Sequence, residues 1–128
     1  MPEVSFAGRT LVRARAQWRC EYCGIHESRG FVEHQIDHII AVKHGGSSEP
    51  GNLALSCTLC NRYKGSDIAS IDPETAVVAT LYDPRNQAWD QHFRSSFGYI
   101  IGLTPHGRAT AQLLRFNGVD RVRERFER

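Results

Sequence analysis

The first half of the sequence changes from a helical to a strand-like spacing of its apolar residues. In residues 8–18 the side chains of Leu11, Ala14 and Trp18 recur three and four residues apart, which predicts a helix. Residues 29–42 are rich in isoleucine and valine, which favour a β-strand. The chain is therefore predicted to begin with a helix that is followed by a strand.

A stretch rich in turn-forming residues comes next. Residues 43–52 contain three glycines, two serines and a proline, and this composition predicts a loop. Residues 58–65 predict a short helix. We expect Gly65 to end it, because glycine readily takes the left-handed conformation found after a helix C-terminus.

The second half carries shorter apolar runs. Its β-branched and aromatic residues predict three short strands, over residues 75–83, 88–97 and 99–103. Helices are predicted over residues 104–118 and 120–128, the last of them amphipathic.

The helix at 104–118 has recognisable end signals. Thr104 can cap its N-terminus, Pro105 suits its first turn, and Gly118 stands where a C-terminal glycine is common. Helices and strands mixed in this way predict an α+β fold. A length of 128 residues suits a single domain over 1–128.

The charged residues are nearly balanced, with 16 basic and 14 acidic residues and a net charge of +2. This total neither requires nor excludes a nucleic-acid partner, because local clustering matters more. All basic residues except Lys43 and Lys64 are arginines, which suit bidentate contacts with phosphate or carboxylate. Four arginines of the first predicted helix and its end form either a basic stripe or ordinary surface charge: Arg9, Arg13, Arg15 and Arg19.

The sequence holds no apolar run near the ~20 residues that a membrane-spanning helix needs. Residues 1–20 also lack the apolar core of a signal peptide. We therefore expect a cytoplasmic protein.

The four cysteines occur as two C-x-x-C pairs, Cys20 with Cys23 and Cys57 with Cys60. Structural disulfides are not expected in the cytoplasm. Two such pairs are typical of a tetrahedral zinc site, and a redox pair or chance spacing is the alternative. A zinc ion held by four thiolates would be structural, because no position is left open for substrate.

An acid and a histidine, Asp37 and His38, stand side by side in the predicted strand, and Asn61 directly follows Cys60. A zinc ion joining the two cysteine pairs would close residues 24–56 into a loop and bring these three side chains together. Oxygen atoms of Asp and Asn suit a hard cation such as Mg²⁺, and histidine can take a proton from water. The pattern predicts metal-assisted phosphodiester hydrolysis.

Each of these residues also has a simpler interpretation. His38 could be a hydrogen-bonded strand histidine, Asn52 a turn residue, and Asn61 the N-cap of the following helix. Arg62 and Lys64 could contact phosphate oxygens or form an ordinary solvated surface.

Taken in order, the motifs C-E-Y-C, I-D-H-I-I, H-G-G and N-L-A-L-S-C-x-x-C-N-x-x-K-G resemble those of HNH endonucleases of the ββα-metal type. The resemblance covers residues 19–65, just over a third of the chain. It implies a zinc-stapled core of two strands and a helix. Residues 66–128 are then a C-terminal strand-and-helix extension, which is similar to one in a group of bacterial HNH proteins and has no assigned role.

The resemblance also implies a role for each matched residue. His38 would be the general base, and Asp37 and Asn61 would bind a catalytic Mg²⁺ or Mn²⁺. Asn52 would hydrogen-bond across the loop and hold the strand of His38 in place. The structural zinc would be bound by Cys20, Cys23, Cys57 and Cys60.

Two positions depart from the family pattern. Asn61 stands where the motif often has histidine, and its amide oxygen favours magnesium or manganese over softer ions. Ala41 stands where proline often follows the D-H-I-I motif, which removes some rigidity from the turn and touches no catalytic group.

These observations predict a divalent-metal-dependent endonuclease that cleaves DNA and, as the family implies, leaves a 5′ phosphate. The alternative is a zinc-stabilised nucleic-acid-binding module without catalysis, which needs the cysteines and basic residues but not Asp37, His38 and Asn61 together. A protein-interaction zinc module is a third interpretation, and it predicts no affinity for DNA even at low salt.

Overall fold

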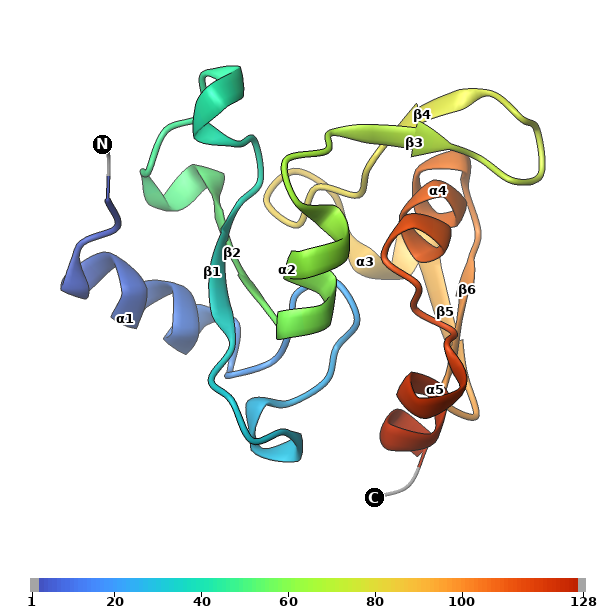
Figure 1. The fold of residues 1–128 in the computed structure, drawn as a ribbon, viewed down its shortest axis with the longest axis horizontal. Helices are drawn as coiled ribbons and strands as arrows, with labels where there is room; N and C mark the ends of the chain where they lie inside the picture. The colour runs from blue at the N-terminus through green and yellow to red at the C-terminus, as the bar shows by residue number, and fades with distance from the viewer. Residues whose placement is uncertain (1–2, 127–128) are drawn as a thin grey trace. The chain divides into compact units, whose positions relative to one another are not determined.

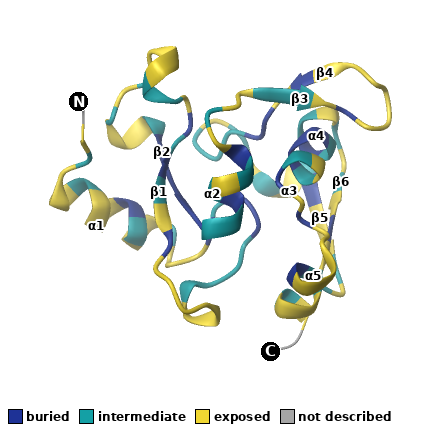
Figure 2. Cartoon of the chain, in the orientation of Figure 1, coloured by how far each residue is buried: buried dark blue, intermediate teal, exposed yellow. Residues whose placement is uncertain are grey.

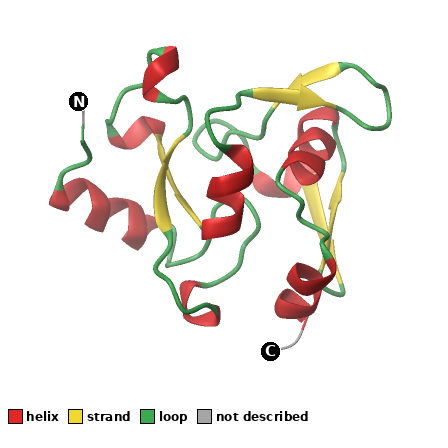
Figure 3. Ribbon diagram, viewed as in Figure 1, coloured by secondary structure: helices red, strands yellow, loops and turns green. Residues whose placement is uncertain are grey.

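The computed structural model describes residues 3–126 as a mixture of helices and short strands (Figure 1, Figure 3). The chain divides into two compact units, Met1–Ser66 and Asp67–Arg128. The described residues form three separate two-stranded antiparallel sheets, so the predicted α+β class is confirmed. The extent of a single folding domain over 1–128 stays a prediction.

The first unit is built around one antiparallel strand pair. Its regular elements are α1 (Phe6–Arg15), β1 (Gln35–His38), β2 (Leu53–Ser56) and α2 (Thr58–Lys64). Three short 3-10 helices lie between them, at Glu27–Arg29, Val42–His44 and Pro50–Asn52. The strands pair with His38 opposite Leu53 and Gln35 opposite Ser56.

The core of the first unit forms between α1 and β2. Val12 of α1 and Leu53 and Leu55 of β2 are fully buried, and Ile36 of β1 packs against them. The dark blue segments of Figure 2 mark this buried strand. The helix starts at the cap Ser5, whose hydroxyl accepts a hydrogen bond from the amide of Gly8 at 3.0 Å.

The first predicted strand is shorter than the sequence pattern indicated, because side chains take its backbone groups at both ends. Before the strand, the amide of His34 donates to the carboxylate of Glu27. After the strand, the side chain of Asn52 bonds both the N–H and the C=O of Ile40. Only Gln35–His38 therefore pairs as a strand.

The second unit contains two hairpins and three helices. Its strands are β3 (Ala69–Ile71), β4 (Val78–Thr80), β5 (Phe93–Ser96) and β6 (Tyr99–Gly102). Its helices are α3 (Trp89–His92), α4 (Pro105–Leu113) and α5 (Val119–Phe126). Strand β3 was not predicted, and residues 89–92 form a helical turn where a strand was expected.

The second unit has an apolar core of its own. Phe93, Ile100, Leu114 and Phe116 are buried, and the rings of Phe93 and Phe116 lie 5.6 Å apart. An amide side chain extends the hairpin, because Asn117 bonds both backbone groups of Ile100 at 2.8 Å.

The start of α4 was predicted correctly and its end was not. The hydroxyl of Thr104 caps the helix by accepting from the amide of Gly107 at 3.1 Å, and Pro105 is in the first turn. The helix ends at Leu113, and Arg115 then takes a left-handed conformation with φ of 53°. Gly118 instead directly precedes α5, and its carbonyl accepts from the amide of Val122.

Candidate functional site

The four cysteines meet at one buried position. Their sulfur atoms all lie within 4.8 Å of one another, and those of Cys23 and Cys57 are 3.7 Å apart. A tetrahedron with Zn–S bonds of about 2.3 Å has sulfur–sulfur edges of about 3.8 Å. The set therefore fits a structural zinc ion, and this predicted site is confirmed in its geometry.

Local hydrogen bonds stabilise the thiolate form of Cys57, whereas burial raises the pKa of Cys20 and Cys60. The amides of Cys23 and Cys60 point at the sulfur atoms three residues earlier, at 3.5 and 3.4 Å. Hydrogen bonds from the neighbouring thiols, that of Cys20 first, lower the pKa of Cys57 far below its ordinary value. Cys57 is also the N-cap of α2, so the helix begins at the metal site. The N-cap interpretation of Asn61 is therefore wrong.

Asp37 is a buried acid with two side-chain partners. Its side chain is 4% exposed; Oδ2 accepts from the hydroxyl of Tyr22 at 2.7 Å and lies 3.1 Å from Nζ of Lys64. Burial raises the pKa of Asp37, and the charge of Lys64 and the hydrogen bond from Tyr22 act in the opposite direction. The carboxylate thus has partners that favour its ionised form.

Lys64 is also buried, with 2% of its side chain exposed. Its ammonium group donates to the backbone carbonyls of His38 and Ile39 at 3.2 and 3.1 Å, in addition to its pairing with Asp37. The sequence leaves open whether this lysine contacts phosphate or lies on the solvated surface. The structure instead ties it to three consecutive residues at the end of β1.

His38 is half-buried at the end of the same strand. Its Nε2 lies 2.9 Å from the hydroxyl of Ser48, which belongs to the loop between β1 and β2. Adjacent strand residues point to opposite faces, so His38 shares its face with Ile36, which packs toward α1 and β2. Asp37 lies on the other face, toward α2.

A groove of about 470 Å³ borders His38 on the strand face that it shares with Ile36. Two arginines of α1, Arg9 and Arg13, line it together with the acids Glu3 and Glu33. Arg13 lies 4.0 Å from Glu33, and its Nε is buried without a hydrogen-bond partner among the described residues. These mixed charges assign no ligand to the groove by themselves.

Asn52 closes the loop between β1 and β2. Its Oδ1 accepts from the amide of Ile40 at 2.9 Å, and its Nδ2 donates to the carbonyls of Ile40 and Ser47 at 2.9 and 2.7 Å. All of the polar atoms of the amide side chain are used across the loop. A simple turn residue would not require this arrangement.

Asn61 lies in α2 and faces Gln35 of β1, because its Nδ2 donates to Oε1 of Gln35. Its Oδ1 accepts no hydrogen bond from the described residues. Asn61 and Lys64 are one turn apart on α2, and their partners Gln35 and Asp37 are two apart on β1. The helix therefore covers one face of the strand with both pairs.

The side chains of Asp37, Asn61 and Lys64 can be compared with the ligands that a catalytic divalent cation requires. Asp37 and Asn61 supply a carboxylate and an amide oxygen from facing elements, a donor set that suits Mg²⁺ or Mn²⁺. Lys64 shares the carboxylate, so a cation at this position meets a resident positive charge. The donor chemistry fits, and Lys64 is a feature that the sequence did not reveal.

Three partners of the site were missed from the sequence. Tyr22 stands between two zinc ligands, and Ser48 lies in the glycine-rich loop. Gln35 could have been found, because it precedes Asp37 by two residues and must share its strand face. Arg62, for which the sequence leaves phosphate contact and ordinary surface charge open, is exposed on α2.

Comparison with known protein families supports the resemblance of the first unit to HNH endonucleases. Residues 20–67 match the family model described as HNH endonuclease, which confirms the resemblance seen in the motifs. No curated protein and no solved structure matches the chain. The first unit thus carries an HNH segment, and this family implies a nuclease with a nucleic-acid substrate.

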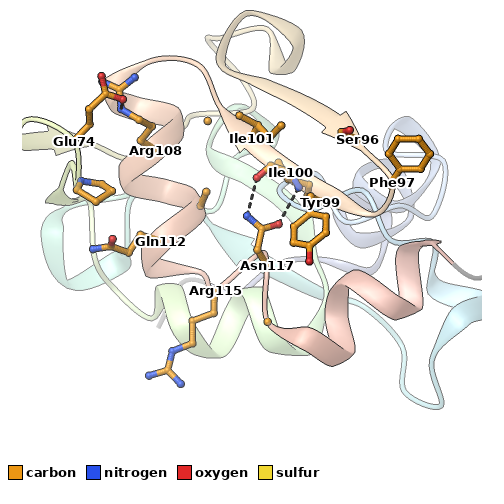
Figure 4. Close-up of a pocket in the computed structure, with 14 residues that line it drawn as sticks. Glu74, Ser96, Phe97, Tyr99, Ile100, Ile101, Arg108, Gln112, Arg115 and Asn117 are labelled. Atoms are coloured by element: carbon orange, nitrogen blue, oxygen red, sulfur yellow. Dashed lines mark hydrogen bonds and ion pairs between the residues drawn. The ribbon is translucent and has the colours of Figure 1, made fainter.

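No helix within residues 3–126 is long and apolar enough to cross a membrane. A hollow of about 940 Å³ lies in the second unit beside α4 and β6 (Figure 4). Arg108 on its rim is bound to Asp72 and Glu74, and Asn117 to the backbone of Ile100, so these polar groups already have partners.

Proposed function

We propose that the protein is a divalent-metal-dependent endonuclease that hydrolyses phosphodiester bonds of DNA. One observation carries this proposal. Asp37 and His38 are consecutive residues of β1, and Asn61 lies on α2, which packs against that strand, within the segment matched to HNH endonucleases. A module that only binds nucleic acid does not need these three side chains.

His38 is proposed as the general base. In the tautomer whose Nε2–H donates to the hydroxyl of Ser48, Nδ1 is the nitrogen that accepts a proton from the attacking water. The clamp of Asn52 on Ile40 holds the chain two residues after His38, which keeps the imidazole in one place. Asn52 therefore supports the base without touching substrate.

Asp37 and Asn61 are proposed to hold Mg²⁺ or Mn²⁺. When bound, such an ion supplies stabilisation for the charge that develops on the phosphate and on the leaving 3′ oxygen. Gln35 contributes by taking the amide N–H of Asn61, so that the amide oxygen remains for the cation. The exposed guanidinium of Arg62 is proposed as a contact for a neighbouring phosphate.

The test is plasmid cleavage by the zinc-loaded protein with and without Mg²⁺ or Mn²⁺. We expect metal-dependent nicking or linearisation, and a loss of about 100-fold or more in His38→Ala, because general base catalysis contributes roughly 10²–10⁴-fold. His44→Ala, which changes an exposed histidine of the loop, is the matched control and should cleave like the wild type.

Two results would contradict the proposal. Wild-type cleavage by His38→Ala would remove the general-base assignment. Zinc-loaded wild type that retains DNA but never cleaves it, with either metal, would support a nucleic-acid-binding module instead.

A further inference from the structure

The acid proposed as a metal ligand is already neutralised by a lysine of its own chain. Asp37 carries one negative charge, and Nζ of Lys64 is 3.1 Å from its Oδ2 and 3.4 Å from its Oδ1. Tyr22 adds a hydrogen bond and no charge. Both charged side chains are almost completely removed from water, so water screens their interaction only weakly.

The position of the ammonium group is set by the fold. Lys64 is the last residue of α2, and its side chain extends to β1, where Nζ donates to the carbonyls of His38 and Ile39. Together with the carboxylate of Asp37, these oxygens give the three N–H groups of the ammonium their acceptors. Lys64 is therefore held in place even when the carboxylate changes partner.

We infer that Lys64 competes with the divalent cation for Asp37 and keeps metal affinity low in the protein without substrate. The inference rests on the proposed function, because it takes Asp37 and Asn61 as the ligands of the metal. A dication that approaches Asp37 is attracted by the carboxylate and repelled by the ammonium of Lys64, whose Nζ lies 3.1 Å from Oδ2 of Asp37. The neutral amide of Asn61 adds no charge to offset this repulsion.

Substrate can change this balance. A phosphodiester brings a negative charge to the same cation, so metal and nucleic acid each favour the binding of the other. Lys64 thus acts as a positioning and affinity-setting residue. In this arrangement the metal is recruited mainly together with the nucleic acid.

The experiment measures Mn²⁺ binding to the zinc-loaded protein without nucleic acid, by the loss of the electron paramagnetic resonance signal of free Mn²⁺. We expect Lys64→Met to bind Mn²⁺ at least tenfold more tightly than wild type, because methionine fills similar space without the charge. Lys43→Met removes the only other lysine, which is exposed, and should leave the affinity unchanged. Asp37→Asn should lose the binding.

Other outcomes separate this inference from the proposed function. Equal or weaker Mn²⁺ binding by Lys64→Met, with Asp37→Asn still abolishing binding, overturns the role of Lys64 alone. Mn²⁺ binding that is unaffected by Asp37→Asn, or absent even at saturating DNA, removes the proposed metal site itself.

Lys64→Gln provides a second variant, because its amide can still donate to a carbonyl of β1 without carrying charge. If both variants lose zinc or fail to fold, the wild-type titration decides. A wild-type dissociation constant for Mn²⁺ below about 100 μM without nucleic acid contradicts the inference, and a larger one supports it.

Discussion

Single side chains of the first unit differ in function according to the partner that each one meets. Asp37 and His38 are neighbours in the chain, yet one is buried against Lys64 and Tyr22 while the other reaches the loop at Ser48. The alternation of a strand separates them. An acid and a base placed side by side in an apolar strand therefore meet different hydrogen-bond partners.

Gly46 shows how closely the loop after His38 is packed. A Cβ atom at this position would lie 1.7 Å from the carbonyl oxygen of Ile40 and 2.8 Å from Nδ2 of Asn52. The first of these atoms is backbone and cannot rotate away. We predict that Gly46→Ala destabilises the first unit by about 1–3 kcal/mol, as overpacking does, and weakens cleavage.

The measurement is chemical denaturation of the zinc-loaded protein together with plasmid cleavage. Gly51→Ala is the matched control, because nothing lies within 4 Å of the added atom, and its effect should stay within about 0.5 kcal/mol. Equal stability of the two variants would show that the loop can open around Gly46 without cost.

At the scale of elements, short helices and strands are held by specific side chains more than by their own length. Helix α2 has seven residues, too few to be stable alone. It is anchored at its start by Cys57 and at its end by Lys64. In the second unit, Arg108 of α4 makes two bonds of 2.9 Å to Asp72, which directly follows β3.

The pair of Asp72 and Arg108 predicts an acid-sensitive second unit. The hydrogen bonds from Arg108 hold the pKa of Asp72 well below its usual range. Because the folded pKa is the lower one, the stabilisation is complete above the unfolded value of about 3.9 and is lost as pH falls through the folded value. We expect Asp72→Asn to be less stable than wild type at pH 7, with a difference that shrinks toward pH 2.

Thermal unfolding from pH 2 to 7 measures this difference. Asp67→Asn, which changes an exposed acid of the same unit, is the control and should follow the wild-type curve. A gap between Asp72→Asn and wild type that is constant over the whole range would contradict the assignment.

At the scale of the whole molecule, each unit has a core of its own, and among residues 3–126 the cysteine cluster that fits a metal ion lies in the first unit. The core of the first unit is small, with Val12, Leu53 and Leu55 at its centre, and Cys57 directly follows β2. The second unit is organised around Phe93 and Phe116. The match to HNH endonucleases falls almost entirely in the first unit.

Removal of zinc should therefore unfold the two units unequally. We predict that a strong zinc chelator, or Cys57→Ser, increases amide hydrogen exchange across residues 3–66, because structural zinc contributes directly to folding free energy. Peptides from β5 and α4 should remain protected. Exchange that increases equally in both units would show that they fold as one, and a fully stable zinc-free protein would show that the cysteines are not a staple.

The sequence by itself determined the zinc ligands, the candidate residues of the nuclease site and the start of α4. These features depend on residue type and spacing, which remain the same in any fold: paired cysteines, Asp37 beside His38, and Thr104 before Pro105. A cap or a metal-ligand pair is a local arrangement of a few residues. Its chemistry can therefore be recognised before the chain is folded.

Only the tertiary structure decided which partner each of these residues meets. In the structure Lys64 is the buried counter-ion of Asp37, and Gln35 is the hydrogen-bond partner of Asn61. Neither pairing could be read from the sequence. The lengths of β1 and α4 also differed from the pattern, because side chains of Glu27 and Asn52 take backbone bonds at the ends of β1, and Arg115 takes a left-handed conformation after α4. Burial and pairing depend on the packing of α2 against β1, and no local spacing records which face of a helix will lie on which face of a strand.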